Sequence, residues 1–300
     1  MTTYVFPGLG SQIKGMGIGL FEAFPDFVKK ADEILGYSIQ TLCLDDPNNY
    51  LNQIQFTQPA VYVVSALSYL KKVQETRQLP NYVAGLSLGE YTALFAADVF
   101  DFEDGLKLVK KRGELMQQTI AGDMAAVMGL SEEKIKEIVS RYKLDGIEIA
   151  SYTAYIQFVI AGPKTVIEAS QPIFEQEGAT MFVPLKVGGA SHCHYMSEAK
   201  AQFESFLKQF NFNPPKIPVI ANTNAKPYLK YGIAENLATQ MVMPVLWRQS
   251  IEYLFQQGET EFEEVGPGKI LTGIIRSIKN SNLPEWNEGQ DLLSLLSEIK

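Results

Sequence analysis

Residues 85–89 of the chain read Gly-Leu-Ser-Leu-Gly, and this pentapeptide constrains the fold more than any other feature. It has the form G-x-S-x-G, which places a serine on the sharp turn between a buried strand and a helix. The letters also arise by chance, but Tyr82–Ala84 suits a short buried strand and Glu90–Ala97 suits a helix. Glycine on both sides of Ser87 lets strand, turn and helix pack closely. The pattern predicts an α/β fold with a nucleophilic serine.

A serine nucleophile needs a base, and the chain contains only two histidines, His192 and His194. A neutral imidazole commonly takes the proton from serine and returns it to a leaving group. Composition alone does not choose between the two. We favour His192 because the glycines before it let backbone approach a site, whereas His194 is expected to project elsewhere. Cys193 is a weaker nucleophile candidate, because adjacent side chains rarely point toward one another.

The composition fits an enzyme rather than a nucleic-acid-binding or membrane protein. A chain of 300 residues with 46% hydrophobic content can bury one large domain, or a large domain and a small one. The net charge of −8, with no basic block, argues against nucleic acid and anionic membranes as partners. We expect neither a membrane span nor a signal peptide. Cys43 and Cys193 lack metal-binding or redox spacing, which predicts free thiols in a reducing cytoplasm and no metal site.

A glycine-rich loop at residues 6–12 follows an expected first strand over residues 1–6. The loop has neither G-x-G-x-x-G spacing nor a Walker lysine, so nucleotide binding is not favoured. A loop after the first strand of an α/β sheet is a suitable source for a second oxyanion-hole amide.

Other elements follow from local patterns. Pro59 is expected at the start of a long apolar helix, where a missing N–H costs little. Asp101 is expected to cap a helix that reaches about Gln118. The remaining expected elements are a helical stretch near Gly19–Leu35, the end of the long helix near Val73, a strand at Lys216–Ala221, and a strand that ends in a loop within Phe262–Gly268.

Residues 124–187 have an order of their own. The pattern is strand, helix, strand, strand, helix, strand, which is the ferredoxin-like βαββαβ arrangement. It predicts a small domain at residues 123–189, inserted into a catalytic domain formed by residues 1–122 and 190–300, with the substrate between the two. The expected elements are strands at Met124–Gly129, Ile147–Ala150, Phe158–Ala161 and Met181–Val187, and helices at Ser131–Tyr142 and Thr165–Glu177.

Seven motifs in order resemble the malonyl-CoA:acyl carrier protein transacylase family, with most similarity to the free-standing acyltransferases of trans-acyltransferase polyketide synthases. The resemblance extends to about Lys279. It implies an α/β-hydrolase-like large domain with an inserted ferredoxin-like domain. The motifs are Phe6-Pro7-Gly8-x-Gly10-Ser11-Gln12, Thr57-Gln58-Pro59-Ala60, Gly85-x-Ser87-Leu88-Gly89-Glu90, Arg112-Gly113-x-x-Met116-Gln117, Ser191-His192, Pro244-Val245-x-Trp247 and Glu264-Val265-Gly266-Pro267-Gly268-Lys269.

The resemblance also implies a reaction. A malonyl-type acyl group would pass from acyl-CoA to Ser87, with His192 as the base, and then to the phosphopantetheine thiol of an acyl carrier protein in polyketide biosynthesis. The family orients that histidine with a backbone carbonyl, at the position of Gln240, so a Ser–His dyad is expected. Acyl-CoA is the implied donor and no cofactor is implied.

Three more positions acquire roles from the resemblance. The backbone amides of Leu88 and Leu9 match the oxyanion-hole positions. Arg112 matches the arginine that binds the free carboxylate of a malonyl group through two hydrogen bonds. Without the resemblance, Arg112 would be interpreted as an exposed arginine on a helix, because two lysines precede it.

The chain departs from the family where the acyl group is expected to bind. Leu9 replaces a usual glutamine, Leu86 replaces a usual histidine, and Ser191 replaces the phenylalanine that malonyl-specific members tend to carry. Residues 151–154 replace a loop that usually contains asparagine. These changes predict a more apolar pocket with room for a substituent on the malonyl group.

Two alternatives stay open. Acyl hydrolases of the same superfamily release stalled acyl groups from carrier proteins, but they tend to lack the arginine. A catalytically silent member would act as a scaffold in a synthase complex, although Ser87 and His192 are both present.

Overall fold

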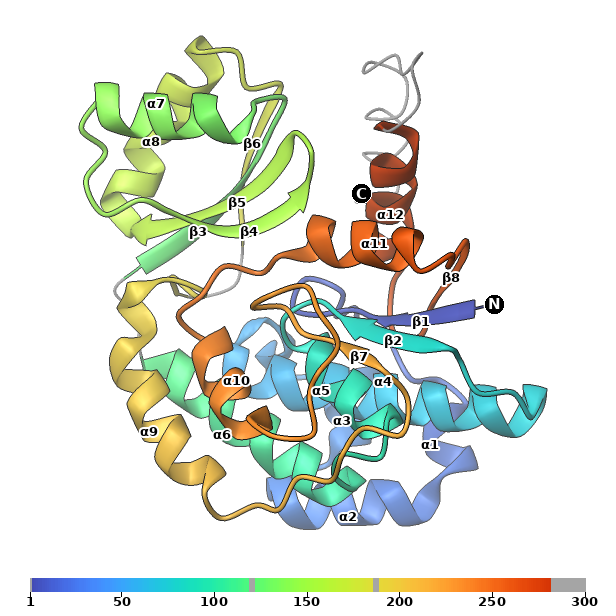
Figure 1. The fold of residues 1–300 in the computed structure, drawn as a ribbon. Helices are drawn as coiled ribbons and strands as arrows, with labels where there is room; N and C mark the ends of the chain where they lie inside the picture. The colour runs from blue at the N-terminus through green and yellow to red at the C-terminus, as the bar shows by residue number, and fades with distance from the viewer. Residues whose placement is uncertain (1, 119–121, 186–188, 282–300) are drawn as a thin grey trace.

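The computed structural model describes residues 2–118, 122–185 and 189–281, which build two four-stranded sheets (Figure 1). The first sheet is parallel throughout and has the order β7-β2-β1-β8. Because parallel strands need crossover connections, helices lie on both of its faces. Its strands are β1 (Thr2–Phe6), β2 (Tyr82–Gly85), β7 (Val219–Ile220) and β8 (Glu261–Glu264).

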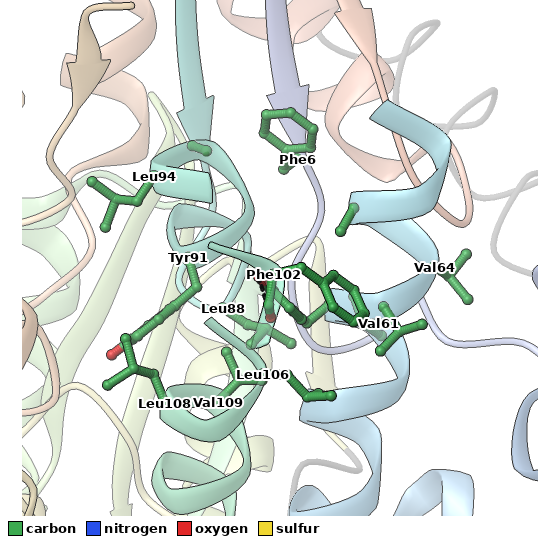
Figure 2. Packing of buried hydrophobic residues seen from close by; sticks show 14 of the residues in the cluster. Phe6, Val61, Val64, Leu88, Tyr91, Leu94, Phe102, Leu106, Leu108 and Val109 are labelled. Carbon is green, nitrogen blue, oxygen red and sulfur yellow. Dashed lines mark hydrogen bonds between the residues drawn. The ribbon is translucent and has the colours of Figure 1, made fainter. Parts of the chain in front are cut away.

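Side chains of β1 alternate between two apolar cores. Tyr4 and Phe6 belong to the larger core, which α4 (Ile54–Thr76), α5 (Gly89–Ala96) and α6 (Phe102–Gln118) complete. Figure 2 shows this packing, with labelled side chains of the three helices below Phe6 in the view. Val5 points to the opposite face, against α11 (Trp247–Gln256) and α12 (Ile270–Ser281). The α/β fold predicted from the sequence is therefore confirmed.

The second sheet is antiparallel, with the order β4-β5-β3-β6. Helices α7 and α8 connect its strands in the order β-α-β-β-α-β, so the predicted ferredoxin-like arrangement is confirmed. The Ser131 hydroxyl caps α7 by accepting from the Lys134 backbone N–H. The bounds are β3 (Gly122–Met128), α7 (Glu132–Arg141), β4 (Glu148–Ala154), β5 (Gln157–Pro163), α8 (Lys164–Gln176) and β6 (Met181–Pro184).

Backbone hydrogen bonds join the second sheet to the rest of the molecule. The Tyr152 amide donates to the Val245 carbonyl at 2.9 Å, and the Val245 amide donates to the Ala150 carbonyl at 2.9 Å. The two ends of the small sheet's chain segment also meet, because a Cβ atom on Gly122 would lie 2.4 Å from that of Ala190. The domain limits at residues 123 and 189 stay a prediction.

Several expected elements have other bounds in the structure, and four of them differ most. The stretch near Gly19–Leu35 forms two helices, because Pro25 lacks an N–H and excludes helical geometry at Phe24. The long helix begins at Ile54, so Pro59 lies inside it and not at its start. The strand expected at Lys216–Ala221 contains only Val219–Ile220, and the one expected at Met181–Val187 ends at Pro184. Residues 186 and 187 lie outside the described part of the chain.

The other helical elements pack around the parallel sheet. Two 3₁₀ turns, η1 (Tyr50–Asn52) and η2 (His194–Met196), precede α4 and α9. Within the described part of the chain, each helix is too short or too polar to cross a bilayer. The remaining helices are α1 (Leu20–Ala23), α2 (Pro25–Leu35), α3 (Ile39–Leu44), α9 (Ser197–Leu207) and α10 (Ile233–Gln240).

Two glycines allow α5 to start directly over the parallel sheet. A Cβ atom on Gly89 would lie 2.0 Å from the Phe6 carbonyl oxygen at the end of β1. A Cβ atom on Gly85 would lie 2.0 Å from the Gly89 carbonyl carbon. Both contacts are with backbone, which cannot rotate away as a side chain can. The turn at Ser87 therefore requires glycine at both positions.

We expect Gly89→Ala to lower the free energy of unfolding by about 3 kcal/mol, because the new methyl group would push α5 away from β1. Urea denaturation of the purified protein measures this. Gly113→Ala on α6 is the graded comparison, since its Cβ would lie 3.1 Å from backbone atoms of α4, a tight contact but a much milder one than the 2.0 Å at Gly89, and the helix gains up to about 1 kcal/mol from alanine. Equal losses in the two variants would contradict the close-approach argument.

Candidate active site

Ser87 lies on the turn between β2 and α5 with a left-handed backbone, at φ 54°. Such a conformation is costly for a residue other than glycine and needs support from its surroundings. Asn222, which follows β7, supplies that support. Its side-chain oxygen accepts from the Ser87 amide at 2.7 Å, and its side-chain nitrogen donates to the Gly85 carbonyl at 2.7 Å. The nucleophile turn is thus held from a neighbouring strand of the sheet.

The structure brings Ser87 and His192 together from positions 105 residues apart. The Ser87 Oγ and the His192 Nε2 are 2.7 Å apart, within hydrogen-bond distance. Both side chains are buried. This geometry suits proton transfer from the hydroxyl to the imidazole. His194 lies elsewhere, on the surface, where its Nδ1 contacts Glu148 of β4.

The other nitrogen of His192 lies 2.8 Å from the backbone carbonyl oxygen of Gln240. A carbonyl only accepts, so Nδ1 carries the proton and Nε2 keeps the lone pair that faces Ser87. Burial, and secondarily the positive charge of Arg112, lower the pKa of His192 to about 4. The imidazole is therefore neutral at physiological pH and able to accept a proton.

Arg112 on α6 is fully buried beside the serine. One terminal nitrogen donates to the Ser87 Oγ and to the Gln240 Oε1, each at 3.1 Å, and the other donates to the Gln58 Oε1 at 2.9 Å. Its Nε atom is buried and has no acceptor among the described residues. Burial lowers the pKa of Arg112, but a guanidinium remains protonated in proteins.

This buried cation makes the site favourable for an anion. The ring of Tyr91 lies 5.5 Å from the Arg112 Cζ, and the side-chain oxygens that accept hydrogen bonds from Arg112 are those of Gln58, Gln240 and Ser87. A buried charge without an ion pair is costly, and a carboxylate offers a guanidinium two parallel hydrogen bonds. An acyl group with a free carboxylate on Ser87 would supply that partner.

The two predicted oxyanion amides lie on either side of the turn. Leu88 follows Ser87 and precedes α5, so its N–H belongs to the first helical turn, where intrahelical acceptors are missing. Leu9 lies in the loop after β1. That loop runs against the turn, since a Cβ atom on its Gly8 would lie 2.4 Å from the Leu86 carbonyl oxygen. The roles of the two amides stay a prediction.

Leu86 and Ser191 have apolar surroundings. Leu86 packs against the core that contains Val245 and Trp247. Ser191 is buried, and its hydroxyl donates to the Met124 Sδ of β3 at 3.2 Å. Ser191 is thus bordered by a thioether, a flexible side chain that tolerates changes in shape.

Three residues of this network received no role from sequence reasoning. Gln58 and Glu90 lie inside quoted motifs, whereas Asn222 lies in none. Asn222 directly follows Ala221, just beyond a parallel strand, and the carboxyl ends of such strands are where ligands bind. That topological signal could have identified it.

Burial raises the pKa of Cys193 to about 11, so this thiol is a poor nucleophile. The described residues hold no cluster of three or more His, Cys, Asp or Glu suited to a metal ion.

Comparison with known proteins assigns the family. Residues 3–287 match the model of the acyl transferase domain. The chain belongs to this family. A polyketide biosynthesis malonyl CoA-acyl carrier protein transacylase of Bacillus subtilis, PksC, is 55% identical over 280 residues, which cover 93% of this chain and 97% of the relative.

Two solved structures of family members are also similar. A malonyl CoA-acyl carrier protein transacylase from Burkholderia pseudomallei has a TM-score of 0.92 and 42% identity, covering 95% of this chain and 99% of that one. A malonyl-transacylase in complex with a type II polyketide synthase acyl-carrier protein has a TM-score of 0.88 and 33% identity, covering 93% of each chain.

The electrostatics of His192 can be measured directly, because the chain has two histidines and His194→Gln leaves one. We expect the His192 imidazole to stay neutral and protonated on Nδ1 from pH 8 down to pH 5, and to titrate near its lowered pKa of about 4. Nitrogen-detected NMR of the imidazole ring measures both the tautomer and the midpoint. A midpoint near 6.5, the ordinary value, would show that the ring is solvated and not buried beside Arg112.

Proposed function

We propose that this chain is an acyltransferase that moves a malonyl-type acyl group from CoA to an acyl carrier protein in polyketide biosynthesis. The acyl group would rest on Ser87 between the two half-reactions. The observation that carries this proposal is the contact between the buried Arg112 guanidinium and the Ser87 Oγ, at 3.1 Å. It positions a carboxylate-binding cation beside the atom that would carry the acyl group.

In the first half-reaction, the Ser87 oxygen attacks the thioester carbonyl carbon of the acyl-CoA while its proton moves to the His192 Nε2. The resulting oxyanion would be stabilised by the amides of Leu88 and Leu9. The intermediate then breaks its carbon–sulfur bond, and the CoA sulfur leaves with the proton from His192. The product is an acyl ester of Ser87 and free CoA.

In the second half-reaction, the phosphopantetheine thiol of the carrier protein gives its proton to His192. Its sulfur attacks the ester carbonyl carbon, and the Ser87 oxygen leaves with the proton. The Gln240 carbonyl supports both directions, since an imidazolium is stabilised by an acceptor at Nδ1. The dyad then needs no carboxylate.

Arg112 would select the acyl group. The carboxylate of a malonyl-type group would take the place of the Ser87 hydroxyl as an acceptor for Arg112, whose Nε atom also lacks an acceptor among the described residues, and would so gain two charge-assisted hydrogen bonds. Leu86 makes the surroundings more apolar, which raises the desolvation cost of a charged group that Arg112 must offset. Ser191, with Met124 beside it, leaves room for a substituent on the malonyl carbon.

The remaining parts of the proposal concern partners and location. The donor is an acyl-CoA, the acceptor is a carrier protein or carrier domain, and no cofactor is needed for the two half-reactions. We also propose that the enzyme works in the cytoplasm. A scaffold without activity has no need of a hydrogen-bonded Ser–His pair, which favours an enzyme.

The choice of base can be tested by mass spectrometry of the intact protein after brief exposure to malonyl-CoA. We expect His192→Ala to slow formation of the acyl-enzyme about 10²–10⁴-fold, because a positioned base is lost. His194→Ala should have little effect, since that side chain lies at the surface against Glu148. Ser87→Ala is the blank and should show no mass increase. The opposite order of effects for the two histidines would overturn the assignment.

The acyl selectivity tests the function itself. We expect malonyl-CoA and methylmalonyl-CoA to acylate Ser87 faster than acetyl-CoA, and Arg112→Ala to remove this preference through a loss of about 10²-fold for the charged donors. The assay follows carrier-protein acylation and release of free acid together, with succinyl-CoA as a longer charged donor. A wild-type protein that prefers neutral acyl groups and releases them mainly to water would support the acyl hydrolase instead.

A further inference from the structure

Glu90 is a buried acidic residue for which the two half-reactions have no role. It lies on the first turn of α5, three residues after the nucleophile, and its side chain is fully buried. An isolated buried carboxylate would be strongly destabilising, so its partners indicate what it is retained for.

Three donors surround the Glu90 carboxylate. Its Oε1 accepts from the backbone N–H of Asn222 at 3.2 Å and from the Tyr228 hydroxyl at 2.7 Å. Its Oε2 accepts from the Gln240 Nε2. An ionised carboxylate only accepts hydrogen bonds, so it satisfies all three donors at once. Asn222 and Gln240 both contact the backbone of the nucleophile turn through their side chains.

The Gln240 side chain has a single orientation compatible with these neighbours. Its Nε2 faces two acceptors, the Glu90 carboxylate and the Ser87 carbonyl oxygen at 3.0 Å. Its Oε1 faces a terminal nitrogen of Arg112 at 3.1 Å. Rotation of the amide by 180° would place donor against donor and acceptor against acceptor. Glu90 therefore acts with the Ser87 carbonyl and Arg112 to fix the direction in which this amide points.

We propose that Glu90 is a positioning residue that holds Ser87, His192 and Arg112 in a common geometry through Asn222 and Gln240. Through Asn222 it supports the left-handed turn at Ser87. It also orients the side-chain amide of Gln240, whose oxygen accepts from Arg112. The same contact holds Gln240 in place, and the backbone carbonyl of Gln240 accepts from His192. The proposal rests on the proposed function only for the part that concerns a malonyl donor.

Glu90→Gln tests this with almost no change in shape. In one orientation, the oxygen of the new side-chain amide accepts from Asn222 and Tyr228, but its NH₂ group then faces the NH₂ group of Gln240. In the opposite orientation, the backbone N–H of Asn222 loses its acceptor. The matched control is Glu259→Gln. Glu259 is also a buried carboxylate with two donors, the Thr3 hydroxyl at 2.9 Å and the Asn81 amide at 3.0 Å, and it has no part in the network around Ser87.

The first readout is the rate at which a fluorophosphonate labels Ser87, which requires the serine and its base but no malonyl group. We expect Glu90→Gln to slow labelling at pH 8 at least about tenfold and malonyl acylation about 100-fold, because small displacements of reacting groups are costly. Glu259→Gln should label within about twofold of wild type, even if both variants lose similar unfolding free energy. Labelling of Glu90→Gln within about twofold of wild type would overturn the proposal.

The second readout is the pH profile of labelling. Burial raises the pKa of Glu90 to about 7, against its hydrogen bonds and the charge of Arg112, which lower it. Other ionisable groups around it are Tyr91 on α5 and Tyr228, whose pKa values burial raises above the ordinary value, and Arg112 on α6, which stays charged. His192 has its lowered pKa of about 4 and stays neutral above pH 5.

Only the ionised form of Glu90 accepts from all three donors, so wild-type labelling should fall to a lower plateau as the pH falls through about 7. Glu90→Gln should be flat from pH 5 to pH 8. Tyr228→Phe removes one hydrogen bond that lowers the pKa of Glu90, so it should move the midpoint upward. If Glu90→Gln does not fold, the midpoint of the labelling profile in Tyr228→Phe provides the test. An unshifted midpoint in Tyr228→Phe, or the same profile in wild type and Glu90→Gln, would overturn the proposal.

The two proposals fail separately. A wild-type protein that reacts with the fluorophosphonate but accepts no malonyl group contradicts the proposed function, and leaves the role of Glu90 to be decided by the labelling rates.

Discussion

A helix can begin directly above the end of a neighbouring strand only if no side chain separates them, and the site depends on this constraint. The Gly89 backbone lies so close to the Phe6 carbonyl that a Cβ atom has no space. The chain must then turn sharply, which forces Ser87 to a left-handed backbone. The same closeness places the start of α5, the positive end of its helix dipole, two residues after the serine. The geometry of the nucleophile thus originates in backbone packing.

Around this turn, the electrostatics follow from one buried cation. The guanidinium of Arg112 helps to lower the pKa of His192, so the imidazole is neutral when it contacts Ser87. The same charge lies next to the serine oxygen and lacks a paired carboxylate at hydrogen-bond distance among its described contacts. Burial is the larger cause of the neutral base, Arg112 adds to it, and the same guanidinium leaves a place for an anionic group. The carboxylate of Glu90 contributes the opposite charge, and the side-chain amide of Gln240 lies between it and Arg112.

The sequence predicted the parts of the fold and site that depend on local patterns. The G-x-S-x-G motif predicted the strand, turn and helix around Ser87, and strand and helix order predicted the second sheet. Gln240 could be placed only by resemblance, because a backbone carbonyl leaves no mark on residue type.

The parts that the sequence did not predict depend on distant contacts. The hydrogen bond from Asn222 to Glu90 joins residues 132 positions apart, and no local pattern pairs them. Pro59 was placed at a helix start by a local rule, whereas the helix begins at Ile54. Packing of α4 against α5 and α6 outweighs the one backbone hydrogen bond that a proline removes.

The meeting of Gly122 and Ala190 has a consequence for how the chain folds. Strand β1 pairs with β8, and the Thr3 to Glu259 hydrogen bond closes a span of 256 residues. Closing a flexible loop costs entropy that grows with the logarithm of its length. Once the antiparallel sheet has formed, residues 122 and 190 at the two ends of its chain segment lie next to each other. The segment between them then adds little to the effective length of the loop that must be closed. Early formation of the small sheet would thus shorten the search that completes the parallel one.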